Sequence, residues 1–280
     1  MISYDFDYHK PTAIQEALEL FQALKKQGKK PVYFSGGTEI ITLGRVNELV
    51  TDAVIDIKAI PECNTYKQDN RLILGAALTL TNVLDLQSFP FLEKAVAEIA
   101  DNTARNKITL GGNICANIIY REAVLPLLLT DSRILLASLD GLTEKPISEL
   151  FHQELQLKDG ELLVQVMTDL EAIQLPFYIV KKRRQWGVGY PLITVAALRK
   201  QNKVHVAISG LCSFPFRNKQ MEDSLNNEQL SIDERIEAAL KHIPATVLDD
   251  VHGSDAYRIF VLKNTLRDIL RVLGGAENDG

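Results

Sequence analysis

Apolar residues recur along the first sixty positions with the spacings of both helices and strands. Ile14, Leu18, Phe21 and Leu24 follow one another at the spacing of one helix face. Short apolar runs that end at polar or turn residues are typical of strands. The pattern predicts strands at residues 2–8, 32–35 and 54–57, and helices at residues 11–26 and 39–47.

The same two periods continue through the rest of the chain, with no low-complexity tract. Thr79 or Thr81 is expected to cap a helix, and Asp140-Gly141 predicts a tight turn. Strands and helices in mixed order predict an α/β or α+β fold. The predicted strands are 71–76, 133–137, 162–166, 194–199 and 203–209, and the predicted helices are 79–86, 91–103, 114–129 (interrupted), 221–225, 232–242 and 257–273.

A change of pattern near Leu175-Pro176 marks a candidate domain boundary, because a strand, a basic run and a new set of helices follow it. A chain of 280 residues is long enough for one large or two medium domains. We therefore expect a first domain at residues 1–172 and a second at residues 173–280.

Charge and hydropathy exclude two classes of partner. The formal net charge of −5 gives no general attraction to nucleic acid or to anionic lipid. The N-terminus has no basic segment followed by an apolar one, so no signal peptide is expected. The longest apolar region, residues 123–137, is interrupted by Asp131 and Arg133, which argues against a membrane span. A cytoplasmic protein is expected.

The cysteines and histidines do not form a metal-binding pattern. Cys63, Cys115 and Cys212 lie far apart, which argues against a disulfide framework and against a local metal site. An iron–sulfur cluster needs four thiolates as a rule, more than this chain has. The five histidines show no ligand spacing. We expect no metal site and no cluster on this chain.

Two Gly-Gly motifs are the main candidates for chemistry. The first, residues 35–39 (Ser-Gly-Gly-Thr-Glu), follows a predicted strand and precedes a predicted helix; the second is residues 109–113 (Thr-Leu-Gly-Gly-Asn). Glycine permits positive φ and a close backbone approach, so main-chain N–H groups can converge on one point. With the positive end of a helix behind it, such a loop suits a phosphate group.

Each motif has a simpler explanation, in which the glycines merely turn a strand into a helix. The first motif lacks the third glycine of a dinucleotide fingerprint, and no Gly-Lys-Ser/Thr follows, which excludes a Walker loop. Two similar motifs beside apolar segments nevertheless suggest two walls around one pyrophosphate. Thr38 is expected to be the N-cap of the following helix, with Glu39 along its first turn.

These residues resemble the FAD-binding (medium) subunits of the molybdenum hydroxylases, the family of xanthine dehydrogenase and carbon monoxide dehydrogenase. That family has an Ala-Gly-Gly-Thr-Asp-like first loop and a Thr-Ile-Gly-Gly-Asn-like second loop, and both hold the FAD pyrophosphate. The resemblance extends nearly end to end and is greatest to the xanthine dehydrogenase type. Its other segments are residues 4–20, 56–62, 71–80, 179–197 and 254–258.

The resemblance implies an α+β fold, with a two-lobed FAD-binding domain followed by a smaller α/β C-terminal domain. It implies FAD as the cofactor and no catalytic acid, base or nucleophile on this chain. Electrons would pass from a molybdopterin-binding large subunit, through a [2Fe–2S] small subunit, to FAD and then to NAD. Xanthine dehydrogenase activity, and hence purine catabolism, is the implied setting.

The resemblance also implies the cofactor-binding residues. Those of the first motif and its flanks are Val32, Tyr33, Phe34, Ser35, Gly36, Gly37, Thr38, Glu39 and Ile40. Those of the second motif and beyond are Thr109, Gly111, Gly112, Asn113, Ala116, Glu122, Lys181 and Lys182. Glu122 matches an acid that reaches a sugar hydroxyl, and Lys181 or Lys182 matches a lysine near the flavin; a solvated basic run is the alternative for the lysines.

The chain departs from the family between Asn113 and Glu122. Where the family has Ala-Ser-Pro and then Asp, this chain has residues 117–121 (Asn-Ile-Ile-Tyr-Arg) and then Glu. Tyr120 is a candidate to stack near the flavin, or else a buried or interface tyrosine. Trp186 is expected in the core or in a subunit contact.

The absence of a nucleophile elbow and of an acid/base pair favours an electron carrier, because the flavin itself holds the reactivity. Within this class the partner enzyme could instead oxidise carbon monoxide, nicotinate or an aldehyde. From a different class, the chain could be a non-redox nucleotide-binding protein.

Overall fold

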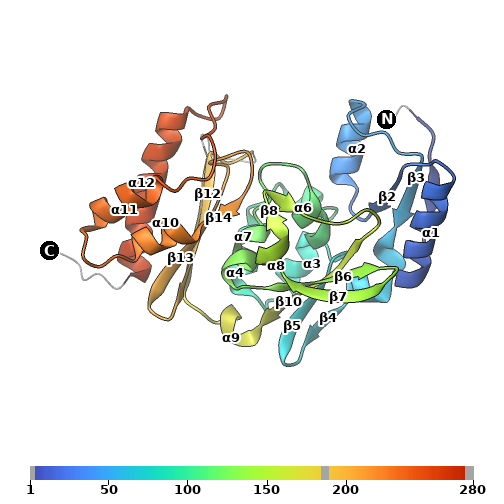
Figure 1. Ribbon diagram of the computed structural model, residues 1–280, viewed down its shortest axis with the longest axis horizontal. Helices are drawn as coiled ribbons and strands as arrows, with labels where there is room; N and C mark the ends of the chain where they lie inside the picture. The colour runs from blue at the N-terminus through green and yellow to red at the C-terminus, as the bar shows by residue number, and fades with distance from the viewer. Residues whose placement is uncertain (1–3, 184–188, 275–280) are drawn as a thin grey trace. The chain divides into compact units, whose positions relative to one another are not determined.

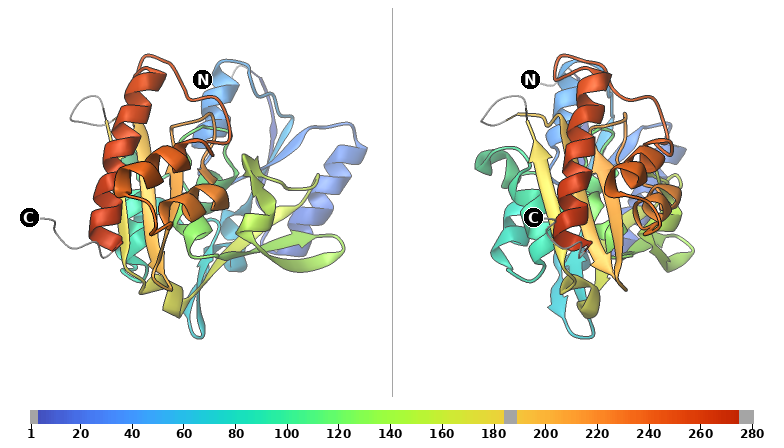
Figure 2. Two further views of the ribbon diagram at one scale, coloured as in Figure 1. Left: turned by 60° about the vertical axis from the view of Figure 1, so that its left-hand side comes forward. Right: turned by 90° about the vertical axis from the view of Figure 1, so that its left-hand side faces the viewer.

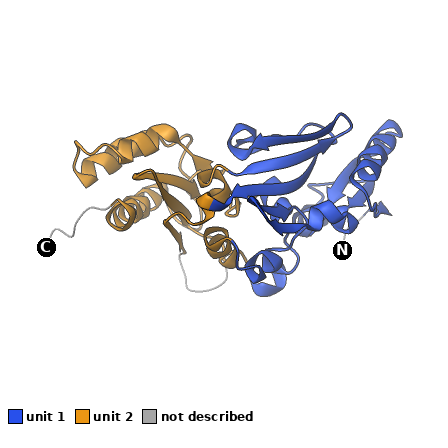
Figure 3. Ribbon diagram, turned by 90° about the horizontal axis from the view of Figure 1, so that it is seen from below, with its two compact units in different colours: residues 1–88, 101–116, 132–170 blue, residues 89–100, 117–131, 171–280 orange. Residues whose placement is uncertain are grey.

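The computed structural model describes residues 4–183 and 189–274, which form two compact units (Figure 3). Unit 1 contains residues 1–88, 101–116 and 132–170, and unit 2 contains residues 89–100, 117–131 and 171–280. The last segment of unit 1 ends at Leu170, two residues before the predicted domain limit at residue 172. Residues 89–100 and 117–131, however, group with the C-terminal part of the chain. The division at 172/173 remains a prediction.

The first layer of unit 1 is a three-stranded parallel sheet with the order β1-β3-β2. Its strands are β1 (Asp7–His9), β2 (Pro31–Phe34) and β3 (Ala53–Asp56), with helices α1 (Ile14–Lys26) and α2 (Thr38–Arg45) in the connections. Parallel strands need such crossover connections. The apolar face of α1 buries Ala17, Leu18, Phe21 and Leu24 beside the fully buried central strand β3.

The second sheet of unit 1 is antiparallel, with the order β4-β5-β10-β6-β7 (Figure 1). Its strands are β4 (Tyr66–Gln68), β5 (Arg71–Gly75), β6 (Arg133–Ser138), β7 (Gly141–Pro146) and β10 (Leu162–Asp169). The predicted turn at Asp140-Gly141 joins β6 to β7. The short elements beside it are η1 (Ile57–Ala59), η2 (Pro61–Asn64), α3 (Leu80–Asp85), α5 (Asn102–Arg105), α6 (Leu110–Cys115), α8 (Ile147–Leu150), β8 (Phe151–His152) and β9 (Glu154–Leu155).

Unit 2 is built on an antiparallel sheet with the order β11-β12-β13-β14. The strands are β11 (Phe177–Lys182), β12 (Ile193–Lys200), β13 (Lys203–Ser209) and β14 (Phe216–Arg217). Figures 1 and 2 show α10 (Lys219–Leu225), α11 (Ile232–Leu240) and α12 (Asp255–Leu273) on one side of this sheet. On the other side are α4 (Pro90–Ala97) and α7 (Val124–Leu129), while α9 (Leu170–Ile173) precedes the sheet. Residues 193–198 of β12 are buried without alternation because helices cover both faces.

Three sequence predictions of helices and strands were wrong in extent. The first strand begins at Asp7 rather than at residue 2. The helix predicted at 91–103 is two helices, α4 and α5, separated near Ala100, whose φ is +49°. The stretch 114–129 is interrupted, as predicted, at residues 120–122, but the break is longer, because α6 ends at Cys115 and α7 begins at Val124; the interruption predicted at Pro126 is absent, since Pro126 lies within α7. An apolar period alone does not reveal such breaks.

The cap of α3 is Thr79, one of the two predicted candidates. Its side chain accepts a hydrogen bond from the Asn82 N–H, and the Asn82 side chain accepts one from the Thr79 N–H. None of the helices within the described ranges combines the length and apolar character that crossing a membrane requires.

Candidate functional site

The first glycine motif lies where β2 ends, at the carboxyl edge of the parallel sheet. In open α/β sheets this edge is where ligands bind. Gly37 is the N-cap of α2 and has a φ of +68°, a left-handed conformation that favours glycine. A Cβ atom at Gly37 would lie 2.2 Å from the Phe34 ring. The turn is therefore possible because residue 37 has no side chain.

The prediction that Thr38 caps α2 was wrong. Thr38 is the first helical residue and is exposed, and Gly37 occupies the cap position without a side-chain hydrogen bond. The first N–H groups of a helix have no acceptor within the helix itself. Because no side chain caps α2, its first turn offers N–H donors and the positive end of the helix dipole to an anion.

The Ser35 hydroxyl is the clearest unsatisfied polar group at this turn. Its Oγ atom is buried and has no hydrogen-bond partner among the described residues. A buried hydroxyl without a partner costs about 1–3 kcal/mol. A ligand with phosphate or hydroxyl oxygens at the turn would remove this cost.

The side chains that flank the first motif play different parts. The Tyr33 hydroxyl donates to the Gly160 carbonyl over 3.0 Å, and its ring stacks on Phe21. Burial raises the pKa of Tyr33, so the phenol stays protonated and belongs to the core. Among the predicted site residues, Val32, Glu39 and Ile40 are half-buried. Because the Tyr33 side chain is engaged elsewhere, only the backbone of Tyr33 could contact a ligand.

The second glycine motif is the first turn of α6, not a loop. Thr109 is the N-cap, and its Oγ1 atom accepts a hydrogen bond from the Gly112 N–H over 3.2 Å. Gly111 and Gly112 do not have positive φ. A Cβ atom at Gly111 would lie 2.6 Å from the Cβ atom of Ala76. Glycine is needed at 111 for close packing rather than for an unusual backbone conformation.

The N–H groups of the second motif are engaged within unit 1. These N–H groups are therefore less available as hydrogen-bond donors to an anion than the N–H groups in the first turn of α2. The bonds are Leu110 N–H to Leu78 O (2.8 Å), Gly111 N–H to Ala76 O (2.8 Å) and Asn113 N–H to Thr109 O (2.9 Å), besides the Gly112 bond above. Buried Thr109 and Asn113 supply the motif's polar side chains.

The two glycine motifs lie against each other. A Cβ atom at Gly36 would come within 2.0 Å of the Lys107 carbonyl oxygen and 3.3 Å of the Ile108 Cα atom. Ile108 directly precedes Thr109, so the backbone of the first motif contacts the segment that leads into the second. The sequence prediction that the motifs share one place in the fold is supported by this contact. Their predicted roles toward a ligand remain predictions.

Lys58 also contacts the first motif, and the sequence analysis did not single it out. Its Nζ atom donates to the Ser35 carbonyl over 2.9 Å and pairs with Asp56 over 2.8 Å. It lies 4.8 Å from the centre of the Phe34 ring. The signal that could have found it is the position of Asp56 at the carboxyl end of the neighbouring parallel strand.

Two of the predicted site residues, Glu122 and Lys181, are paired with each other in unit 2. Their side chains are only 3% and 6% exposed, and their charged atoms lie 2.6 Å apart. Burial raises the pKa of Glu122, and the nearby Lys181 opposes this effect. Lys181 also donates to the Glu98 carbonyl over 2.7 Å. The two side chains form a buried ion pair, and their predicted contacts with a cofactor remain predictions.

Three further candidate residues are Lys182, Ala116 and Tyr120. Lys182 is exposed and lines a shallow pocket beside Tyr257 and Asp268 of α12. Ala116 is the buried residue at the end of α6. Tyr120 is buried, and its ring stacks on Tyr190 at 4.8 Å. Arg184 of the basic run and Trp186 lie outside the described residues.

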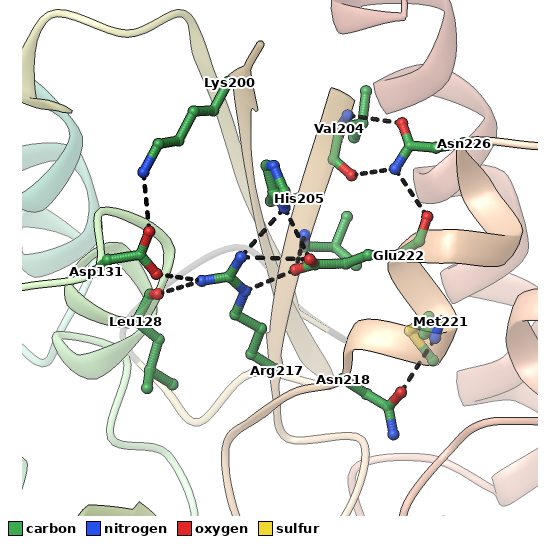
Figure 4. A network of polar contacts seen from close by, with 11 residues as sticks. Leu128, Asp131, Lys200, Val204, His205, Arg217, Asn218, Met221, Glu222 and Asn226 are labelled. Atoms are coloured by element: carbon green, nitrogen blue, oxygen red, sulfur yellow. Dashed lines mark hydrogen bonds and ion pairs between the residues drawn. The ribbon is translucent and has the colours of Figure 1, made fainter. Parts of the chain in front are cut away.

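A second polar cluster of unit 2 joins β13, β14 and α10 to the end of α7 (Figure 4). Glu222 accepts a hydrogen bond from Arg217 over 2.7 Å and contacts His205 Nδ1 at the same distance. Arg217 also reaches Asp131 over 2.8 Å and the Leu128 carbonyl over 2.7 Å. These contacts lie within unit 2 and join the end of α7 to the sheet.

This cluster predicts a loss of stability in acid. Burial alone would raise the pKa of Glu222, but hydrogen bonds from His205 and Arg217 outweigh it and lower the pKa below its usual 4.5. The stabilisation is therefore present above about pH 4.5 and is lost as the pH falls through the lowered pKa. Urea unfolding between about pH 7 and pH 3 should show a smaller acid-induced loss for Glu222→Gln than for wild type. Equal losses for the two proteins would contradict this prediction.

A helix terminus without a capping side chain beside glycines, on a mixed helix and sheet fold, is an arrangement that suits the phosphate groups of a nucleotide. The comparisons with known proteins make this specific. Residues 4–168 match the family described as "FAD binding domain in molybdopterin dehydrogenase", and the chain belongs to this family.

Curated relatives match the chain over most or over part of its length. The 6-hydroxypseudooxynicotine dehydrogenase complex subunit alpha of Paenarthrobacter nicotinovorans is 26% identical, over 95% of this chain and 93% of its own. The nicotinate dehydrogenase FAD-subunit of Eubacterium barkeri is 24% identical, over 88% and 87%. The xanthine dehydrogenase FAD-binding subunit of Escherichia coli O157:H7 is 30% identical, over 58% and 57%.

Solved structures confirm the predicted fold class. A chain of carbon monoxide dehydrogenase from Hydrogenophaga pseudoflava superposes with a TM-score of 0.85 at 20% identity, covering 98% of both chains. A chain of quinoline 2-oxidoreductase from Pseudomonas putida 86 gives a TM-score of 0.82 at 20% identity, covering 96% of both. At these identities the likeness concerns the fold, which is the α+β flavoprotein type that the sequence predicted.

Proposed function

We propose that this chain carries FAD as the electron-transfer subunit of a molybdenum hydroxylase complex. The contact between the two glycine motifs is the observation that carries the proposal, because it puts both predicted phosphate-binding segments in one place. FAD, when bound, supplies reversible electron uptake. The chain's own part is to bind and orient the cofactor.

The residues of unit 1 fit a diphosphate. The first turn of α2 offers N–H donors without a capping side chain, and the Ser35 hydroxyl is buried and unpartnered among the described residues. Residues 35–40 would hold the phosphates, with Thr109 and Asn113 as the polar side chains of the second motif. In unit 2, the roles of Glu122 toward a sugar hydroxyl and of Lys181 or Lys182 toward the flavin belong to the same proposal.

The proposed partners are a molybdopterin-binding large subunit and a [2Fe–2S] small subunit, with NAD as the final acceptor and the cytoplasm as the location. Among the described residues, no three His, Cys, Asp or Glu side chains are grouped so that they could hold a metal ion. The relatives named above are themselves called a subunit of a complex or an FAD-subunit.

The substrate would be determined by the large subunit. Xanthine is one candidate, and nicotinate, carbon monoxide or an aldehyde are others. Relatives that match over most of this chain are named for 6-hydroxypseudooxynicotine, nicotinate and nicotine, whereas the xanthine dehydrogenase subunit matches over 58% of it. Urate formation from xanthine by the assembled complex, with reduction of NAD, would favour xanthine. Turnover of nicotinate alone would exclude it.

Replacing Ser35 with alanine should weaken FAD binding without weakening the fold. The hydroxyl has no partner among the described residues, so its removal costs no internal hydrogen bond and relieves an unsatisfied buried group. A lost hydrogen bond to a charged ligand oxygen corresponds to roughly a tenfold loss of affinity. Fluorescence titration with FAD and thermal unfolding of the apoprotein measure the two effects.

Ser88→Ala is the matched control. The Ser88 hydroxyl has partners within the protein, Tyr66 and the Leu86 carbonyl, so its removal should affect stability slightly and FAD binding not at all. Failure of the wild-type chain to bind FAD, while it binds another nucleotide, would reject the proposed function in favour of a non-redox nucleotide-binding protein.

A further inference from the structure

Lys58 connects two strands at the carboxyl edge of the parallel sheet. It lies in the 3-10 turn η1, two residues after the end of β3, and its ammonium group reaches across to the turn that follows β2. There it donates to the Ser35 carbonyl over 2.9 Å and lies over the Phe34 ring. Lys58 thus contacts the backbone of the first glycine motif and the aromatic ring of the residue that precedes it.

The acid that holds Lys58 is itself fixed. Asp56 has a side chain that is 2% exposed and accepts hydrogen bonds from the Lys58 ammonium (2.8 Å), from the Lys58 backbone N–H (3.0 Å) and from the Tyr8 hydroxyl. Burial would raise the pKa of Asp56, but the hydrogen bonds from Lys58 and Tyr8 outweigh it and lower the pKa. Asp56 is therefore a permanent carboxylate that restrains the ammonium on the Ser35 side.

The hydrogen bond to the Ser35 carbonyl determines the orientation of a peptide plane. The peptide unit is planar and trans, so its C=O and N–H groups point in opposite directions. When Lys58 holds the Ser35 oxygen, the Gly36 N–H of the same peptide points away from Lys58. The next residue, Gly37, has the left-handed conformation that begins α2. Lys58 therefore fixes the peptide that enters the glycine turn.

The positive charge of Lys58 also favours a diphosphate at this turn. Without it, the buried Asp56 carboxylate would be an unpaired negative charge directly before η1 and beside the turn, where it would repel a diphosphate. The Lys58 side chain remains 42% exposed, so the ammonium is not withdrawn into the core. An ammonium has three donors, and Asp56 and Ser35 account for two of them.

We propose that Lys58 is a positioning residue of the cofactor site, which holds the Ser35–Gly36 peptide in the orientation that binds a diphosphate and neutralises Asp56 beside it. The inference rests on the proposed function, because the diphosphate is that of FAD. It adds a residue outside both glycine motifs and a reason for the Asp56–Lys58 pair.

The test uses Lys58→Met in the full-length chain. Methionine keeps an unbranched apolar side chain but removes the charge and the donor. We expect the dissociation constant for FAD to rise about tenfold or more, and the inhibition constant of ADP, measured as a competitor of FAD, to rise by a similar factor, because both ligands carry the diphosphate. Lys58→Arg should restore affinity to within about threefold of wild type, because guanidinium can keep the charge and both acceptors.

The matched control is Lys29→Met. Lys29 is also a half-exposed lysine of unit 1 paired with an aspartate, Asp7, but it does not contact the glycine motifs. The Lys29→Met variant should bind FAD as the wild type does. If Lys58→Met destabilises the fold, Lys58→Gln, which keeps a neutral donor, gives the same comparison with an intermediate loss of affinity.

Each outcome decides between the two proposals. Unchanged FAD and ADP affinity in Lys58→Met would overturn the role of Lys58 and leave the proposed function standing. So would equal losses in Lys58→Met and Lys58→Arg, since these would indicate a packing role alone. Absence of FAD binding by the wild-type chain would reject the proposed function itself.

Discussion

Replacing Gly36 with alanine should abolish FAD retention and lower the stability of unit 1. The added methyl group would lie 2.0 Å from the Lys107 carbonyl oxygen and 2.9 Å from its carbon, both of which are backbone atoms. Backbone atoms cannot rotate away as a flexible side chain can, so the two glycine motifs would have to separate. Overpacking of this kind costs about 1–3 kcal/mol or more, and we expect FAD affinity to fall about a hundredfold.

The flavin absorbance of the purified protein and its thermal unfolding measure both parts of this prediction. Gly189→Ala is the control, because nothing among the described residues lies within 4 Å of a Cβ atom there, and it should change neither quantity. A Gly36→Ala protein that keeps its full flavin content would show that the contact between the motifs is not needed for binding. Because the substitution also strains the fold, Ser35→Ala separates binding from stability.

The first glycine motif could be predicted from the sequence because its information is local. A strand, two glycines and a helix follow one another, and the structure has these elements in that order at β2, residues 35–37 and α2. The error concerned the cap, since Thr38 is a favourable capping residue by type. Gly37 takes the cap position because the Phe34 ring leaves no space for a side chain there.

The second motif and Lys58 depend on contacts that no local pattern contains. Gly111 is required because Ala76 lies against it, and Ala76 is far away in the sequence. The proposed role of Lys58 follows from its contact with Ser35, in the turn after the neighbouring strand β2. Glu122 and Lys181 were each predicted as site residues, but their pairing could not be, because it requires knowing that β11 lies beside the segment before α7. Such long-range contacts are the part of the fold that one sequence does not reveal.

Arg258 is the position where a substitution should cost unit 2 most. Its side chain is fully buried and donates to the carbonyls of Leu192, Gly210 and Gly253 and to the Asp250 carboxylate. One guanidinium thus satisfies backbone carbonyls next to the start of β12, next to the end of β13 and in the turn before α12. Arg258 lies in segment 254–258, one of the segments that resemble the family. Its contacts within unit 2 explain an arginine there without a ligand.

Arg258→Met should lower the free energy of unfolding of unit 2 by about 3–5 kcal/mol, since it leaves several buried acceptors and the Asp250 carboxylate unpaired. Arg258→Lys should recover little of this loss, because one ammonium cannot reproduce the planar fork that spans these acceptors. The control is Arg267→Met, which removes a pair with the 71%-exposed Asp233 and should cost less than about 1 kcal/mol. Hydrogen exchange at residues 192, 210 and 253 locates the effect in unit 2. Equal stabilities of the Arg258 and Arg267 variants would mean that solvent or rearranged backbone satisfies the acceptors, and that the buried guanidinium does not organise the unit.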